Sequence, residues 1–130
     1  TVSWGGMGIL WGYPVATVYV RPQRYTYEFM EKNDFFTLSF FPDSLRSALQ
    51  ICGSKSGRNS DKIKEAGLTL KPAGSSTSFE EARLILVCRK IYYNDIQPEH
   101  FLDPQIASNY PSKDYHRMYI GRIEEVLVRE

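Results

Sequence analysis

The stretch ARLILVCRKIYY, residues 82–93, is a long apolar run in the second half of the chain, and it decides the class of fold. This pattern predicts a long strand that is buried on both faces for much of its length. Further strands are predicted at PVATVYV (residues 14–20), FFTLSFF (35–41) and MYIGRIEEVLV (118–128). Gly121, inside the last of these strands, indicates a bulge or a close backbone approach.

Short helices are predicted between these strands at RYTYEFMEKN (residues 24–33), at SLRSALQIC (44–52), where apolar residues recur at helical spacing, and after the polar loop of residues 53–60. The residues expected to begin or end them are Thr26, Asn33, Asp43, Gly53, Ser60 and Gly67. The strands outnumber the helices, and regular crossover helices between strands are missing. The sequence therefore predicts a mainly β fold, a small antiparallel barrel with short peripheral helices, formed by a single domain over residues 1–130.

The N-terminal stretch SWGGMGILWG, residues 3–12, is rich in glycine but is not a dinucleotide-binding fingerprint. Gly6 and Gly8 match the first half of G-x-G-x-x-G, but Trp11 occupies the third glycine position and Pro14 follows before a helix could begin. The alternative is a strand at residues 2–4 that leads into a bend permitted by the glycines. Because the chain opens on Thr1 inside this strand, we expect an N-terminal segment to be missing.

Composition limits the classes of function. The 130 residues carry 16 basic and 15 acidic side chains, a net charge of +1, which disfavours binding to nucleic acid or to an anionic membrane through bulk charge. Cys52 and Cys88 lie far apart in apolar segments, which indicates two buried thiols in a reducing, cytoplasmic compartment. No membrane-helix, signal-peptide, metal-hydrolase or serine-hydrolase pattern is present, and no metal site is predicted.

Three places could carry chemistry. The polar loop GSKSGRNSDK, residues 53–62, has hydroxyls, cations and glycines suited to a phosphate, although a solvated basic loop has the same composition. Arg21 and Arg24 flank Pro22 and form a second possible anion site or a charged surface. His116 is a candidate general acid, ligand or hydrogen-bonding residue, whereas His100 has no partners in view and is expected to be structural.

Four stretches, in this order, resemble the flavin reductase-like family of FMN-binding split barrels, which includes the flavoredoxins: TVSWGG, PVATVYVRPQRYTYEF, CGSKSGRNSDK and DYHRMYIGRIEEV. The resemblance covers most of the chain and implies a split β-barrel. In the family, an Asn of the flavin site lies a few residues before the position of Thr1, in the segment that we expect to be missing.

The resemblance also implies the site residues. Trp4 would lie near the flavin ring, and Lys62 would meet either the phosphate or the negative charge of reduced flavin. His116 matches a position near the flavin, where the nicotinamide of NAD(P)H would stack, and is the candidate catalytic residue. The implied FMN-binding residues are Thr1, Ser3, Trp4, Arg24, Tyr25, Thr26, Ser54, Ser56, Gly57, Arg58 and Lys62.

Members of this family usually hold flavin at a dimer interface, so the resemblance implies a homodimer. Three functions stay open: an NAD(P)H-dependent flavin reductase, an FMN-carrying electron-transfer protein that uses a protein partner, and a dimeric split barrel without catalytic activity. The first is the expected function.

Overall fold

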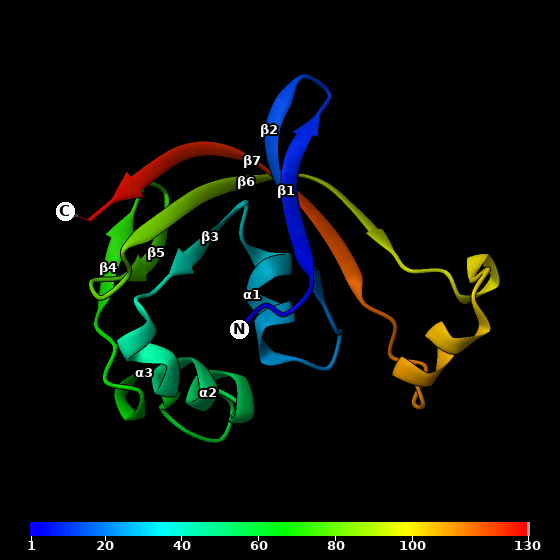
Figure 1. Cartoon of the computed structure of the whole chain (residues 1–130), viewed down its shortest axis with the longest axis horizontal. Helices are drawn as coiled ribbons and strands as arrows, with labels where there is room; N and C mark the ends of the chain where they lie inside the picture. The colour runs from blue at the N-terminus through cyan, green and yellow to red at the C-terminus, as the bar shows by residue number, and fades with distance from the viewer. Residues whose placement is uncertain (130) are drawn as a thin grey trace.

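A twisted antiparallel sheet forms the centre of the computed structural model, which describes residues 1–129; Glu130, the last residue of the predicted domain, lies outside the described residues (Figure 1). Five strands pair in the order β1-β2-β7-β6-β3, and β4 and β5 form a separate hairpin. The outermost strands, β1 and β3, do not pair with each other, so the sheet is not closed. The strands are β1 (Gly5–Leu10), β2 (Tyr13–Val20), β3 (Phe35–Phe40), β4 (Leu70–Ala73), β5 (Ser76–Phe79), β6 (Leu84–Asp95) and β7 (Arg117–Val128).

Strand β6 supplies the core on both of its faces, as its sequence predicted. Its residues Ile85, Leu86, Val87 and Cys88 are all buried. Because successive side chains point to opposite faces of a strand, Leu86 and Cys88 join one hydrophobic cluster and Ile85 and Val87 join another. Burial raises the pKa of the Cys88 thiol to about 11. The second thiol differs from the prediction, because Cys52 is only half-buried.

Gly121 on β7 lies where the sheet has no room for a side chain. A Cβ atom built there would come within 2.6 Å of the Phe36 ring and 2.9 Å of Cys88 Cβ. The register of β6 against β7 also shifts between Lys90 and Tyr92, opposite this point. The predicted close approach at Gly121 is therefore present, and an irregularity of the sheet lies beside it.

The helices are short; Asn33 and Gly67 follow the ends of α1 and α3 as predicted, but the predicted starts and the end of α2 differ. Their bounds are α1 (Tyr25–Lys32), α2 (Arg46–Ser54) and α3 (Lys62–Glu65), with 3-10 turns η1 (Asp43–Leu45), η2 (Pro98–His100) and η3 (Pro104–Asn109). Thr26 lies inside α1, Asp43 belongs to η1, and Gly53 lies inside α2, so none of these three is the predicted cap. Asp61, not Ser60, caps α3 by accepting a hydrogen bond from the Lys64 amide at 3.2 Å.

Two further predictions about strands were wrong. Residues 2–4 are not a strand; instead the glycine-rich stretch, predicted to bend, forms strand β1, and the turn comes later at Trp11 and Gly12. Residues 70–79, for which no strand was predicted, form the β4–β5 hairpin. Gly74 turns between these strands with a φ of +56°.

A long connection, residues 96–116, runs from β6 to β7 and extends away from the rest of the molecule (Figure 1). Arg117 closes its base by donating to both carboxylate oxygens of Asp95, at 2.7 and 3.0 Å, and to Glu31 of α1 at 3.0 Å. We call residues 96–116 the arm. Across residues 1–129, the helices are all too short or too polar to traverse a lipid bilayer.

Candidate functional site

A cleft of about 560 Å³ opens between the start of α1 and the segment of residues 57–63. Its volume lies within the range of about 300–1,000 Å³ that is usual for sites of small molecules. The lining combines aromatic side chains, a hydroxyl pair, a carboxylate and two cations: Tyr25, Thr26, Phe29, Gly57, Arg58, Ser60, Asp61, Lys62 and Ile63.

Tyr25 holds the two walls of this cleft together. The Arg58 guanidinium lies 5.0 Å from the centre of the Tyr25 ring, and Phe29 packs edge-on against the same ring at 4.8 Å. A Cβ atom on Gly57 would come within 3.0 Å of Tyr25 Cδ2, so the loop approaches the ring closely only because this residue is glycine. The cleft is therefore shaped both by the start of α1 and by the polar loop, the two segments in which the phosphate-binding residues were expected.

The cations around the cleft differ in how far they are already paired. Arg58 forms an ion pair with Glu28 at 3.1 Å and donates to the carbonyl oxygen of Gln23 at 3.1 Å. Lys62 Nζ donates to the carbonyl oxygen of Cys52 at 3.1 Å. Within residues 1–129, neither Lys62 nor Arg24 has a carboxylate within ion-pair distance. The cleft thus has positive charge that its own carboxylates do not fully neutralise.

His116 lies at the start of β7, beside a second group of aromatic side chains. Its ring is 5.1 Å from that of Trp4 and 6.4 Å from that of Tyr19. The side chain is only 8% exposed, and its Nδ1 lies 2.7 Å from the hydroxyl of buried Tyr110. Burial, followed by the positive charges of Arg21 and Arg24, lowers the pKa of His116 below 6.5, although Asp114 acts in the opposite direction. The imidazole is therefore neutral at pH 7.

Arg21 is committed to the arm and is not available as the second anion site that its position beside Pro22 suggested. Its guanidinium donates to Asp114 at 2.9 Å and to the carbonyl oxygen of Asn109 at 2.9 Å, and it lies 4.9 Å over the Tyr110 ring. Gln23 also donates to Asp114. These hydrogen bonds, first that of Arg21, lower the pKa of the Asp114 carboxyl.

The predicted site residues thus fall into separate groups. The cleft gathers Tyr25, Thr26, Gly57, Arg58 and Lys62, while Trp4 lies against His116. The remaining residues stand around these groups: Ser56 Oγ accepts from the Arg58 amide, Ser54 Oγ donates to Ile51 O, Thr1 lies against Gly53 of α2, Arg24 precedes α1, and Ser3 is exposed.

Sequence reasoning missed Tyr110 and Tyr19, the aromatic neighbours of His116, and Phe29 and Ile63, which line the cleft. Phe29 follows Tyr25 by four residues, so the helical period could have placed it on the same face of α1. Tyr110 and His116 both lie in the arm, six residues apart, but this spacing matches neither a helical nor a strand period, so no pattern predicts their contact.

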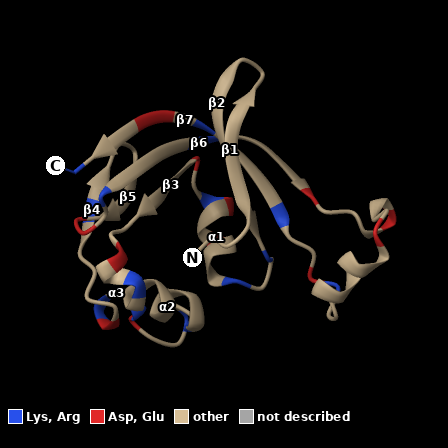
Figure 2. Ribbon diagram, viewed as in Figure 1, with Lys and Arg blue, Asp and Glu red and all other residues tan. Residues whose placement is uncertain are grey.

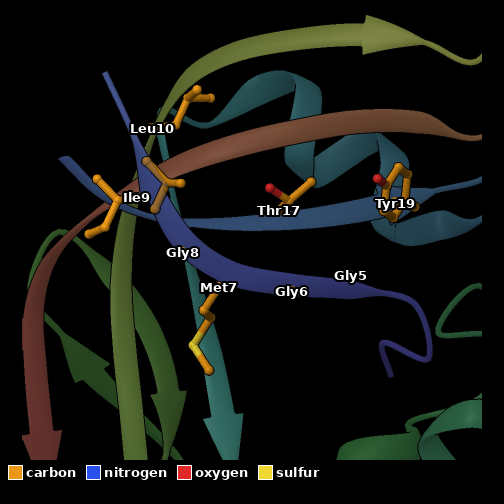
Figure 3. Close-up of a pocket in the computed structure, with 9 residues that line it drawn as sticks. Gly5, Gly6, Met7, Gly8, Ile9, Leu10, Thr17 and Tyr19 are labelled. Carbon is orange, nitrogen blue, oxygen red and sulfur yellow. The ribbon is translucent and has the colours of Figure 1, made fainter. Parts of the chain in front are cut away.

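A second hollow, of about 480 Å³, lies along β1 and β2 (Figure 3). Three glycines of β1 contribute no side chains to it, and Thr17 and Tyr19 of β2 line it beside Met7, Ile9 and Leu10. All residues of β1 are exposed. Since Tyr19 also contacts His116, this hollow and the aromatic group of His116 share a side chain.

No group of three or more His, Cys, Asp or Glu residues within residues 1–129 has a geometry that could hold a metal ion. The donor set of the cleft, cations and hydroxyls, suits an anion instead.

Solved structures with this fold cover nearly the whole chain. Flavoredoxin of Desulfovibrio vulgaris (Miyazaki F) superimposes with a TM-score of 0.75 at 23% identity, over 99% of this chain and 60% of its own. An FMN-binding protein from Thermus thermophilus has a TM-score of 0.72 at 21% identity, over 98% of this chain and 60% of its own. A split-barrel domain protein from Shewanella frigidimarina has a TM-score of 0.75 at 16% identity, over 99% and 58%.

These likenesses confirm the predicted split barrel. The chain spans about 60% of the length of the solved structures that it matches. No curated protein matches the chain. The sequence pattern of the flavin reductase like domain matches residues 10–130, which is most of the chain. The chain therefore belongs to the flavin reductase like domain family, as its resemblance implied.

Proposed function

We propose that this chain binds FMN and transfers electrons from NAD(P)H to the flavin. The observation that carries this proposal is the cleft between α1 and residues 57–63, where Arg58, Lys62 and the hydroxyl of Thr26 meet. A phosphate monoester carries nearly two negative charges and binds best to guanidinium and ammonium groups and to hydroxyls. The donor set of the cleft fits the phosphate of FMN.

The group around His116 suits the flavin ring system. Trp4 is half-exposed beside His116, so an aromatic face next to the imidazole is accessible to a flat ligand. Arg24 lies between this aromatic group and the cleft: it directly precedes α1, which lines the cleft, and its positive charge helps to lower the pKa of His116. One ligand could therefore extend from the cleft to His116. When bound, the flavin supplies the hydride and electron chemistry. The chain would hold its phosphate and present His116 to the reacting face.

A homodimer is part of the proposal, and the β1–β2 hairpin is its proposed interface. The first twenty residues contain no charged side chain, and Figure 2 shows the hairpin as a projection without Lys, Arg, Asp or Glu. Met7 is 62% exposed and Ile9 76% exposed on β1. Edge strands of monomeric proteins are normally protected by charged residues, and a bare apolar edge is typical of an interface.

The second copy would cover the hollow along β1 and the neighbouring face with Tyr19. Because Tyr19 contacts His116, a dimer formed there would enclose one side of the proposed flavin site. We also propose that residues 1–130 form one domain and that the protein works in the cytoplasm, where the free Cys52 and Cys88 would stay reduced.

Ligand titration tests the assignment of the phosphate. Arg58→Ala should weaken FMN by about 1.5–3 kcal/mol, the contribution of a charged hydrogen bond, and leave the affinity for riboflavin almost unchanged. Arg83→Ala, which removes an exposed arginine at the start of the β6 segment, is the matched control. Equal losses for both ligands would reject the phosphate assignment.

Activity separates the remaining functions. A flavin reductase should oxidise NADH or NADPH in an FMN-dependent reaction. A protein that carries FMN but does not oxidise a nicotinamide would instead fit electron transfer with a protein partner. Failure to retain or bind any flavin, judged from the visible absorption spectrum, would leave the non-catalytic dimer.

A further inference from the structure

The hydrogen bond between Tyr110 and His116 joins two buried side chains of the arm that are six residues apart in the sequence. Tyr110 ends the η3 segment of the arm and is 6% exposed, and His116 precedes β7 and is 8% exposed. The Tyr110 hydroxyl and His116 Nδ1 are 2.7 Å apart. Which of the two atoms supplies the proton depends on the tautomer of the imidazole.

The tyrosine hydroxyl is the better donor in this pair. Within residues 1–129, His116 Nδ1 is the one acceptor hydrogen-bonded to this hydroxyl, so a bond in the other direction would leave the hydroxyl proton without an acceptor in the protein. Burial raises the pKa of the Tyr110 hydroxyl, which therefore keeps its proton. Burial also lowers the pKa of His116, so its ring is neutral and carries one N–H. If Nδ1 accepts, that N–H is at Nε2.

The arm holds the Tyr110 ring in place for this bond. Phe101 stacks on it at 6.2 Å and Tyr115 packs against it at 5.0 Å. On another side, the Arg21 guanidinium lies 4.9 Å from the ring centre. Three side chains thus restrict the direction in which the hydroxyl points.

Nε2 of His116 is not completely enclosed, although the residue as a whole is only 8% exposed. Asp114 Oδ1 is the one fully buried side-chain polar atom within residues 1–129 that lacks a partner. His116 Nε2 also has no hydrogen-bond partner in the protein, but it is not one of the fully buried atoms. Part of its surface therefore stays in contact with solvent. The two ring nitrogens point in different directions, and Nε2 therefore faces away from Tyr110.

We propose that Tyr110 is a positioning residue that holds His116 in the tautomer with its proton on Nε2, so that His116 presents a hydrogen-bond donor to an oxygen atom of the bound flavin or nicotinamide. This role rests on the proposed function. The ligand group it fits is a carbonyl or carboxamide oxygen, and His116 acts there as a donor and not as a base.

Nitrogen NMR of the flavin-free protein tests the tautomer independently of any flavin binding. The chain has two histidines, and His100→Gln identifies the signals of His116 by leaving them alone in the spectrum. At neutral pH, His116 should show a protonated Nε2 and an unprotonated, hydrogen-bonded Nδ1. A proton on Nδ1 would overturn the proposal.

Tyr110→Phe keeps the ring and removes the hydroxyl. In this variant His116 should lose the signature of a hydrogen bond at Nδ1, and reduction of bound FMN by NADH should slow about three- to tenfold while FMN affinity stays unchanged. Tyr93→Phe, which removes the hydroxyl of an exposed tyrosine on β6 in the same way, should affect neither property.

The two proposals fail in different ways. If wild-type His116 shows the expected tautomer but the protein binds no flavin, the proposed function fails and the tautomer assignment stands. If Tyr110→Phe binds FMN and NADH reduces this bound FMN at the wild-type rate, the positioning role of Tyr110 is overturned.

Discussion

At the scale of single residues, Arg58 already has a carboxylate partner with which a phosphate would compete. Its guanidinium pairs with Glu28 at 3.1 Å, and both side chains are well exposed to solvent. An exposed ion pair contributes about 0.2–1 kcal/mol, whereas a hydrogen bond to a charged group contributes about 1.5–3 kcal/mol. A phosphate in the cleft should therefore displace Glu28 from Arg58.

Glu28 consequently competes with the proposed phosphate. We expect Glu28→Gln to lower the Kd of FMN about two- to fivefold, because the variant frees Arg58 and removes a negative charge near the ligand. Riboflavin, which has no phosphate, should bind as before. Glu124→Gln, which breaks another exposed ion pair, Arg89–Glu124, is the control and should change neither affinity. An unchanged FMN affinity in Glu28→Gln would contradict this competition.

His116 makes stability depend on pH in a defined window. Its pKa is lowered by folding, so around pH 6 the unfolded chain binds more protons than the folded one, and the free energy of unfolding decreases as pH falls below about 6.5. The loss ends once pH lies below the pKa of the folded state. Urea unfolding at pH 7 and at about pH 5.5 should show this decrease in the wild type and a smaller one in His116→Gln. Carboxyl groups contribute mainly at lower pH, near 4. Equal slopes in both proteins would show that His116 is not the titrating group.

At the scale of elements, the β1–β2 hairpin turns through two residues that both have positive φ, Trp11 at +54° and Gly12 at +74°. This is the geometry of a type I′ turn, in which asparagine and glycine are preferred. A tryptophan in this conformation costs about 1–2 kcal/mol, and Trp11 recovers part of that cost through its edge-on contact with Tyr92 at 5.8 Å.

The strain at Trp11 can be measured with two variants that both remove the indole. Trp11→Asn should be more stable than Trp11→Ala by about 1 kcal/mol, because asparagine tolerates the left-handed conformation and alanine does not. Urea unfolding is best compared in chains that also carry Ile9→Lys, because a charge at this exposed position of β1 should prevent dimerisation and keep the unfolding independent of protein concentration. If the alanine variant is as stable as the asparagine variant, the turn is not strained at this residue.

The same hairpin explains how far the sequence predicts the elements. Strands β2, β3, β6 and β7 were predicted because their apolar residues satisfy the period or the burial of a strand. Strand β1 was not predicted, because Gly5, Gly6 and Gly8 disfavour strands by themselves and form one only by pairing with β2. The start of α2 was also predicted wrongly. Asp43, the expected cap, belongs to the 3-10 turn η1, and α2 begins only at Arg46.

The site was less predictable than the strands. The polar loop and the start of α1 were recognisable from their hydroxyls, cations and glycines, and the structure brings them to one cleft. The surroundings of His116 depend on the irregular path of the arm, which returns Tyr110 to His116 over six residues, and on Trp4 and Tyr19, which reach it only through the tertiary fold. Likewise, the pairing of Arg21 with Asp114 joins residues 93 positions apart, which no local pattern encodes.

At the scale of the whole molecule, charge is unevenly distributed. Figure 2 shows charged residues on the helices, on β6 and β7 and along the arm, while the β1–β2 hairpin carries none. The exposed apolar side chains of this hairpin, including Met7, Ile9 and Trp11, would favour association in water. An uncharged edge strand offers both backbone hydrogen bonds and apolar area to a second copy of the chain.

The last prediction tests this assembly. We expect the wild-type chain to sediment as a dimer, at about twice its mass of 15.0 kDa, and Ile9→Lys to sediment as a monomer, because a charge would be buried without a partner in the interface. Leu70→Lys places the same charge on an equally apolar, exposed position of β4, outside the hairpin, and should remain dimeric. If the dimer encloses one side of the flavin site, Ile9→Lys should also bind FMN more weakly than Leu70→Lys does. A wild-type monomer that binds FMN, or an Ile9→Lys variant that stays dimeric, would exclude this hairpin as the interface.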